Sequence, residues 1–160
     1  MPHDLFNDPN AVETVPSHTG QSADQVSSLG RSVQHDNGVG EQDDVLAALS
    51  FLTGSGFQPV DLAGYSFGAW VNAHALQKDT LTKQMIMVSP PVGFMDFKSI
   101  VTMNTLKFVV TGNRDDIAPA NVIEKMISTW NPNARFEVID GADHFYGGYL
   151  GQLEACLSSI

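Results

Sequence analysis

Basic residues are scarce in this chain, and those present are not clustered. Eight Lys and Arg stand against 18 Asp and Glu, which gives a formal net charge of −10 at pH 7. Binding to nucleic acid or to an anionic membrane surface needs concentrated positive charge. We therefore expect neither a nucleic-acid partner nor a membrane partner, and we attribute the acidic excess to solubility.

Cysteine is almost absent, because Cys156 is the only one. No disulfide can form within the chain, and a reducing compartment fits best. The sequence has no basic-then-apolar leader and no apolar run of membrane-spanning length. The acidic residues Asp36, Glu41, Asp43 and Asp44 lack the regular spacing of a calcium loop. We expect a cytoplasmic protein that holds no metal and no cofactor.

The 160 residues, 42% hydrophobic and 16% charged, suit one domain with a real core but are few for a complete α/β enzyme. Residues 1–38 are rich in Ser, Asp, Asn, Gln, Gly and Pro, and their apolar residues show no period. We predict a poorly ordered or degenerate N-terminal segment over 1–38 and an α/β domain over 39–160. The turn signal Asn37-Gly38 marks the boundary.

Beyond Gly40, short apolar runs alternate with segments of helical spacing. The runs predict strands near Val60 to Gly64, Met85 to Val88, Leu106 to Thr111 and Arg135 to Ile139. Near-continuous apolar strands separated by helices imply a mainly parallel sheet with helices on both faces.

Four helices are expected between and around these strands. Their inward-facing residues are predicted to be Val45, Ala48, Leu49 and Leu52 in the first helix, the small apolar residues of 67–77 in the second, Val122, Ile123, Met126, Ile127 and Trp130 in the third, which Pro119 opens, and Leu150, Leu153, Leu157 and Ile160 in the last.

The segment Gly64-Tyr65-Ser66-Phe67-Gly68 joins the first strand to the helix after it. A serine on such a sharp turn holds its hydroxyl clear of the sheet edge. The backbone N–H of Phe67 then points at the oxygen of the group that is attacked. The turn is strained, and we expect a Cβ at Gly64 or Gly68 to press on the neighbouring strand or helix. Ser66 is the predicted nucleophile.

Two more residues suited to acyl transfer follow later strands, at the edge where functional groups of a parallel sheet gather. A serine hydroxyl is a weak nucleophile, so a neutral imidazole must take its proton. A carboxylate must hold that imidazole in the right tautomer and stabilise the imidazolium. We predict His144 as base and then acid, and Asp115 as the orienting carboxylate. The chain order Ser, Asp, His is that of an α/β-hydrolase triad.

Other titratable residues are open to different interpretations. Asp116 lies one step from Asp115 and competes for its role, although we favour Asp115. Asp143 adjoins His144 in sequence and is badly placed to pair with its ring, so we expect a structural or rim carboxylate. His74 is expected to be packed or capped. The histidines without any partner pattern are His3, His18, His35 and His74.

Together these residues resemble a known family: small bacterial α/β-hydrolase-fold proteins, related to dienelactone hydrolases and serine carboxylesterases. The resemblance covers the chain from about Gly30 onward. It implies the α/β-hydrolase fold and hydrolysis of a small acyl ester through an acyl-enzyme on Ser66. We call the sharp turn at Gly64-Tyr65-Ser66-Phe67-Gly68 the nucleophile elbow. A serine at the elbow points away from dienelactone hydrolase itself, which uses cysteine there. The segments that carry the resemblance are 36–41, Gly64-Tyr65-Ser66-Phe67-Gly68-Ala69-Trp70, Ser89-Pro90-Pro91, Gly112-x-x-Asp115 with Pro119, and Gly141-Ala142-Asp143-His144-Phe145.

The N-terminal part departs from that family, whose members open with further strands and a His-Pro-rich loop. Pro2-His3-Asp4-Leu5-Phe6 resembles a remnant of that loop, which implies an oxyanion hole built from the N–H groups of Phe67 and Leu5. The opening strands are missing. The chain is then a naturally shortened homologue, a fragment with a misassigned start, or a homodimer that covers the exposed sheet edge.

Two alternatives to a serine esterase remain. The first is a catalytically silent homologue that binds a ligand or a partner chain. The second is a triad enzyme with non-hydrolytic chemistry, such as a lyase or a perhydrolase.

Overall fold

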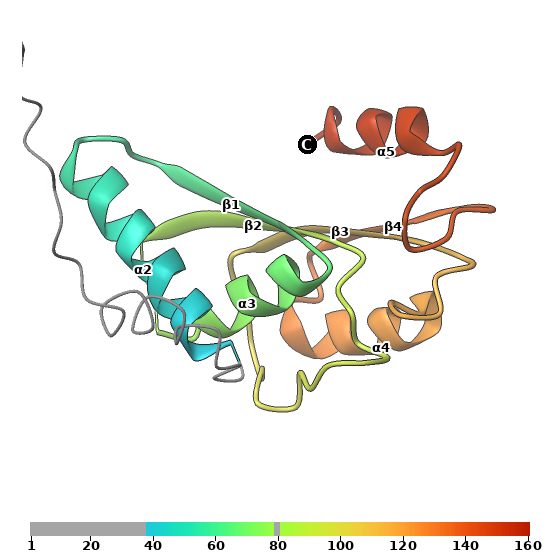
Figure 1. Ribbon diagram of the computed structural model, residues 1–160, viewed down its shortest axis with the longest axis horizontal. Helices are drawn as coiled ribbons and strands as arrows, with labels where there is room; N and C mark the ends of the chain where they lie inside the picture. Colours follow the sequence, from blue (N-terminus) through green and yellow to red (C-terminus); the bar gives the residue numbers. More distant parts are fainter. Residues whose placement is uncertain (1–37, 79–80) are drawn as a thin grey trace, which may run out of the picture. The chain divides into compact units, whose positions relative to one another are not determined.

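The four predicted strands pair in parallel in one sheet, in the order β1-β2-β3-β4. The computed structural model describes residues 38–78 and 81–160. The strands are β1 (Val60–Tyr65), β2 (Thr82–Val88), β3 (Leu106–Gly112) and β4 (Arg135–Ile139). Figure 1 shows their carboxyl ends at the right-hand side of the molecule. The predicted parallel sheet is confirmed.

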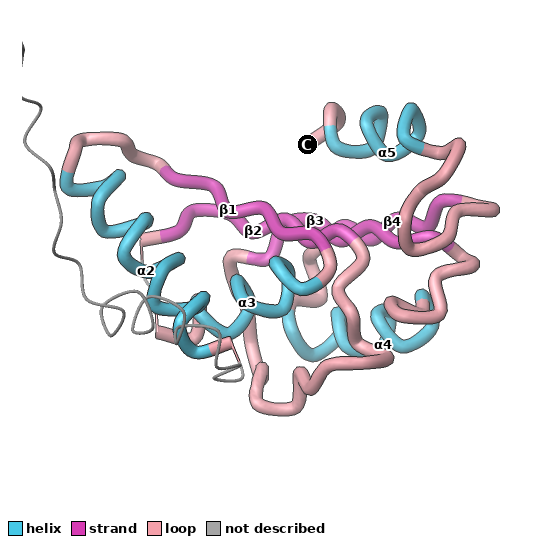
Figure 2. Tube along the Cα trace, in the orientation of Figure 1, coloured by secondary structure: helices cyan, strands magenta, loops and turns pink. Residues whose placement is uncertain are grey.

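The helices lie on both faces of the sheet, as predicted, but unequally (Figures 1 and 2). The lower face in that view carries α2 (Val39–Gly54), α3 (Phe67–Ala75) and α4 (Ala120–Trp130). The upper face carries only α5 (Leu150–Leu157) among the described helices.

The main core fills the space between the sheet and the helices below it. In α4 the i, i+4, i+7 series Ile123, Ile127 and Trp130 is buried, and Met126 packs against the same core at half burial. Val122 is half buried. These were the predicted inward residues. The same core contains Trp70, Val71, Met85, Met87, Phe97, Ile100, Met103, Leu106 and Val109.

The first helix packs less of its predicted face. Leu49 is buried and Val45 is half buried, whereas Ala48 is exposed, contrary to the prediction. Gly38 directly precedes the helix, and its φ of 79° is a left-handed conformation that glycine adopts without strain. A Cβ there would lie 2.4 Å from the ring of Trp70, so the Asn37-Gly38 signal marks a close approach as well as a turn.

The last helix is turned differently from the prediction. Leu153 packs against the small upper core together with Tyr149 and Cys156, a spacing of i, i+4, i+7. Leu150 is 65% exposed, and the predicted inward residues Leu157 and Ile160 are also exposed. The pattern of leucines alone does not show which face of a short helix meets the sheet.

The strand β1 lies at one edge of the described sheet, and its upper face is open. Asp61, Ala63 and Tyr65 alternate with half-buried residues and are exposed. That a second copy of the chain covers this edge stays a prediction.

Predictions that concern residues 1–37 lie outside the described residues. These include the poorly ordered segment, the remnant loop and Leu5. No helix within residues 38–78 and 81–160 has the length and apolarity needed to cross a membrane.

Candidate active site

Ser66 lies between β1 and α3 in an unusual backbone conformation, with φ 50° and ψ −120°. A non-glycine residue with positive φ is strained, and such strain gathers at functional sites. Two bonds fix the turn from both sides. The N–H of Ser66 donates to the carbonyl of Val88 in β2 at 2.9 Å, and its carbonyl accepts from the N–H of Ala69 at 2.9 Å.

The two glycines of the motif differ in what surrounds them. A Cβ at Gly64 would lie 2.6 Å from the backbone N of Ala69 and from the carbonyl O of Gly68, so strand and helix touch there. At Gly68 an added Cβ meets nothing within 4 Å among the described residues. The prediction that both positions are sterically closed is therefore right for Gly64 and wrong for Gly68. Gly68 is an ordinary position in the first turn of α3.

His144 lies in the loop between β4 and α5, and it is only 6% exposed. Its Nε2 is 2.8 Å from the Oγ of Ser66. Its Nδ1 is 2.9 and 3.0 Å from the two carboxylate oxygens of Asp115. Since an ionised carboxylate only accepts hydrogen bonds, Nδ1 carries the proton in this arrangement and Nε2 is left to accept one from the serine.

Asp115 follows β3 and is itself fixed by the backbone around it. Its Oδ1 accepts the N–H groups of Ile117 at 3.0 Å and Ala118 at 2.8 Å, and its Oδ2 accepts the hydroxyl of Thr111 at 3.4 Å. The side chain is fully buried, whereas Asp116 is exposed. The structure thus brings Asp115, not Asp116, to the histidine.

The N–H of Phe67 belongs to the first residue of α3, where it has no acceptor within the helix. It lies beside Ser66 at the positive end of the helix dipole, a position suited to a developing oxyanion. The second predicted donor, Leu5, lies outside the described residues.

The remaining candidates have structural contacts. His74 stacks against Trp70 with ring centroids 4.3 Å apart and reaches the carbonyl of Asp96 at 3.2 Å, so it is packed, as expected. Asp143 is exposed and accepts the N–H of Phe145 at 3.0 Å, which agrees with a structural carboxylate. His3, His18 and His35 lie outside the described residues. Within the described residues no group of three or more His, Cys, Asp or Glu is arranged to hold a metal ion.

Sequence reasoning gave no role to two tyrosines that contact this site. The hydroxyl of Tyr65 donates to the backbone carbonyl of His144 at 2.8 Å. The hydroxyls of Tyr146 and Ser89 are hydrogen-bonded at 2.7 Å, and both residues are buried. The pKa of Tyr146 is raised to about 12, mainly by burial; the hydrogen bond with Ser89 opposes the rise and the nearby Asp115 carboxylate adds to it. The only sign of these contacts in the sequence is that Tyr65 immediately precedes Ser66 and that Tyr146 lies two residues after His144.

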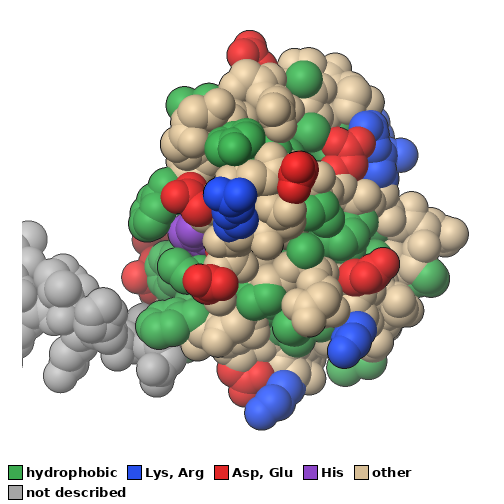
Figure 3. Space-filling view, turned by 90° about the vertical axis from the view of Figure 1, so that its right-hand side faces the viewer, with side chains coloured by type: hydrophobic (Ala, Val, Ile, Leu, Met, Phe, Trp, Pro, Cys, Tyr) green, Lys and Arg blue, Asp and Glu red, His purple; other side chains and the backbone are tan. Residues whose placement is uncertain are grey.

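The surface at the carboxyl ends of the strands is chemically mixed. Figure 3, which looks onto this side of the molecule, shows hydrophobic, acidic and basic side chains interspersed, with no large area of one charge. Two phenylalanines next to the candidate residues are exposed, namely Phe67 at 44% and Phe145 at 75%.

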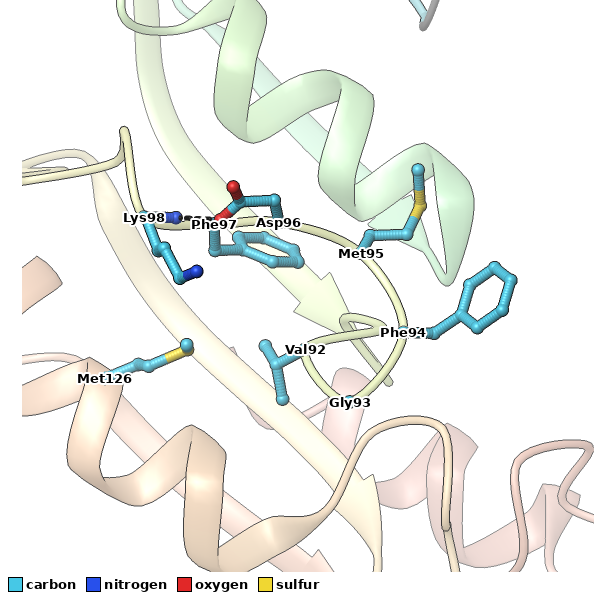
Figure 4. A pocket seen from close by; sticks show the side chains of 8 residues that line it. All are labelled: Val92, Gly93, Phe94, Met95, Asp96, Phe97, Lys98 and Met126. Carbon is cyan, nitrogen blue, oxygen red and sulfur yellow. Dashed lines mark hydrogen bonds between the residues drawn. The ribbon is translucent and has the colours of Figure 1, made fainter.

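A separate pocket of about 320 Å³ lies along the loop after β2, at residues 92–98, and is closed on one side by Met126 of α4 (Figure 4). Phe97 is buried and packs against Trp130 with ring centroids 5.3 Å apart. The ring of Phe94 extends away from the other labelled side chains in Figure 4. None of Ser66, Asp115 and His144 lines this pocket, and we assign it no part in the site.

No protein-family model matches the chain. An uncharacterised protein of Rickettsia prowazekii (strain Madrid E) is 28% identical over 127 residues, which cover 73% of this chain and 53% of that protein. An alpha-beta serine hydrolase homologue from Coxiella burnetii superposes with a TM-score of 0.70 at 31% identity, over 79% of this chain and 62% of that one. An α/β serine hydrolase without lid from Xanthomonas campestris gives a TM-score of 0.68 at 26% identity, over 78% and 56%.

The chain thus has the α/β-hydrolase fold and resembles serine hydrolases of that fold, as the sequence predicted. It spans between about half and three-fifths of the length of these proteins.

Proposed function

We propose that this chain, with its α/β-hydrolase fold, is a serine hydrolase that cleaves small acyl esters through an acyl-enzyme on Ser66. One observation carries the proposal. The Oγ of Ser66, the ring of His144 and the carboxylate of Asp115 form a continuous chain of hydrogen bonds of 2.8 to 3.0 Å, although they come from three distant parts of the sequence.

In the acylation step the Oγ of Ser66 attacks the ester carbonyl carbon, and its proton moves to Nε2 of His144. The carbonyl oxygen becomes an oxyanion that the N–H of Phe67 stabilises. The intermediate collapses as the bond to the alcohol oxygen breaks, and the imidazolium returns the proton to the leaving alcohol. Asp115 stays ionised throughout and stabilises the imidazolium.

In the deacylation step His144 takes a proton from water, and the resulting hydroxide attacks the acyl carbon. Collapse of this second intermediate breaks the bond to Ser66, which recovers its proton from His144. This step releases the acid and regenerates Ser66. Over the whole cycle one ester and one water give one alcohol and one acid.

The surroundings of Ser66 favour a neutral substrate with an apolar group. Phe67 directly follows the nucleophile in sequence and Phe145 directly follows the base. Both side chains are exposed, and either ring offers an apolar surface to an acyl or alcohol group. A mixed surface without a large positive area gives no reason to expect a polyanionic substrate.

A fluorophosphonate probe tests the proposal directly, because it phosphonylates only an activated serine. We expect the purified chain to be labelled and to hydrolyse p-nitrophenyl esters of short acids. Ser66→Ala is expected to abolish both, while Ser99→Ala, which changes an exposed serine of the loop after β2, leaves both unchanged. A folded chain that is never labelled contradicts the proposal and favours a non-catalytic protein that binds a ligand or partner.

A further inference from the structure

The loop that carries His144 has neither helix nor strand between the end of β4 and the start of α5. The imidazole must nevertheless stay within hydrogen-bonding distance of both Ser66 and Asp115. Those two contacts orient the ring, but they do not by themselves fix the backbone from which the ring extends. Contacts to the backbone of His144 therefore affect the fraction of time that its ring is positioned to react with Ser66.

Tyr65 makes such a contact from the elbow itself. Its hydroxyl donates to the carbonyl oxygen of His144 at 2.8 Å, and the two rings lie with centroids 5.4 Å apart. Tyr65 is the last residue of β1 and immediately precedes Ser66. This hydrogen bond therefore ties the backbone of the candidate base to the strand that carries the candidate nucleophile, across 79 positions of sequence.

A second contact holds the loop two residues further on. The hydroxyl of Tyr146 is bonded at 2.7 Å to that of Ser89, which directly follows β2. Both residues have positive φ, 55° for Tyr146 and 45° for Ser89. Non-glycine residues persist in this conformation only where the surrounding structure imposes it. The buried hydroxyl pair is such a constraint on the loop.

We propose that Tyr65 is a positioning residue, which holds His144 against Ser66 through its hydrogen bond to the His144 carbonyl, with the Ser89–Tyr146 pair as a second anchor of the same loop. This inference rests on the proposed function of Ser66 and His144. The inference assigns the role to the hydroxyl of Tyr65 and not to its ring. If only the packing of the ring mattered, replacing Tyr65 by phenylalanine would have no effect.

The state of the hydroxyl is consistent with donation. Burial first, and then the carboxylates of Asp115 and Asp143, raise the pKa of Tyr65 above its ordinary value. The phenol therefore keeps its proton across the neutral range, where it is needed as a donor to a carbonyl oxygen.

The test compares Tyr65→Phe with the unchanged chain in fluorophosphonate labelling. Tyr65 is 47% exposed, and the change removes one oxygen, so the variant is expected to fold. We expect the labelling rate at saturating probe to fall roughly tenfold, which corresponds to the loss of one hydrogen bond. The probe concentration at half saturation should not change, since Tyr65 is not argued to bind the probe.

Tyr149→Phe is the matched control. It removes a phenolic hydroxyl from the same loop, but one that faces Gly141 rather than His144. We expect this variant to label at the rate of the unchanged chain. Equal labelling rates for Tyr65→Phe and the unchanged chain would overturn the inference and leave the proposed function intact.

A second measurement does not depend on activity. The ring nitrogens of His144 are observed by NMR in histidine-labelled protein and assigned with a His144→Gln variant. We expect the His144 nitrogen shifts to move in Tyr65→Phe and to stay unchanged in Tyr149→Phe. If the probe never labels the unchanged chain, the proposed function fails, but the NMR measurement still tests the contact between Tyr65 and His144. Unchanged His144 nitrogen shifts in Tyr65→Phe overturn the inference, and changed shifts support the contact on which it is based.

Discussion

The two halves of the candidate site are held in place by different means. Ser66 is fixed by backbone geometry, since strand and helix approach so closely at Gly64 that no Cβ fits between them. His144 is fixed by polar side chains, since Asp115 bonds to its ring and Tyr65 to its carbonyl. The position of Ser66 depends on the absence of a side chain at Gly64, whereas the position of His144 depends on hydrogen bonds with particular polar atoms.

This difference predicts two kinds of sensitivity. Added volume should disturb the elbow and with it the packing of the sheet, which is a loss of stability. Removal of a polar atom from the histidine half should leave the fold in place and reduce the rate of chemistry. Substitutions of each kind therefore separate the contribution to folding from the contribution to catalysis, and they show whether the two halves are as different as their contacts suggest.

The largest expected effect is that of Asp115→Asn on activity. An amide in place of the carboxylate favours the wrong tautomer of His144 and no longer stabilises the imidazolium. The corresponding change in a serine protease lowers kcat about 10⁴-fold. We expect a loss of roughly that size here, measured as the rate of fluorophosphonate labelling and of ester hydrolysis.

Asp116→Asn is the matched control, because Asp116 is adjacent and exposed. It should keep most of the activity. Equal losses in the two variants, or a larger loss at Asp116, would show that the wrong carboxylate has been assigned and that the histidine half is not held as described.

The next effect concerns stability and the other half of the site. In Gly64→Ala the new Cβ would lie 2.6 Å from the backbone N of Ala69, and backbone atoms cannot move aside as a flexible side chain does. We expect the free energy of unfolding to fall by about 3 kcal/mol, at the upper end of the range for overpacking. Urea unfolding followed by circular dichroism measures it.

Gly68→Ala adds the same methyl group at the other glycine of the motif, where the new Cβ would meet nothing within 4 Å among the described residues. It should be neutral or slightly stabilising, because alanine favours a helix. If both variants lose the same stability, the elbow is not held by close packing at Gly64.

The same contrast explains which features could be predicted from the sequence. The elbow is local, because one glycine, one serine and the change from strand to helix lie within a few residues. The strands were recognisable because each is a short apolar run, and Asp115 could be preferred to Asp116 on motif spacing alone. The free space beside Gly68 was not predicted, because a sequence motif identifies a residue type but does not show which atoms surround it.

The contacts of the histidine half join residues far apart and depend on side-chain geometry. Nothing in the sequence relates Ser89 to Tyr146 or Tyr65 to His144. The facing of α5 was wrong for a similar reason, since the rotation of a short helix is set by what it packs on. Tyr149, Leu153 and Cys156 meet the sheet there, whereas Leu150 was expected to.

The smallest expected effect concerns the second anchor of the histidine loop and appears only at alkaline pH. Burial raises the pKa of Tyr146 from its ordinary value of 10 to about 12, so the folded chain keeps a proton that the unfolded chain loses between these values. The stability that this proton contributes is fully present below pH 10 and is lost as the pH rises toward 12. By pH 11.5 the loss should reach about 2 kcal/mol.

Urea unfolding at intervals from pH 9 to 11.5 measures this loss. Cys156, whose pKa burial raises to about 11, contributes a decrease in an overlapping window, so only the difference between the unchanged chain and Tyr146→Phe isolates the tyrosine. The variant has no phenol to ionise at this position, and its stability should fall less steeply above pH 10. Parallel curves would mean that Tyr146 is ionised as easily in the folded chain as in the unfolded one. The buried bond to Ser89 would then not be the constraint on the loop that the strained backbone at both residues indicates.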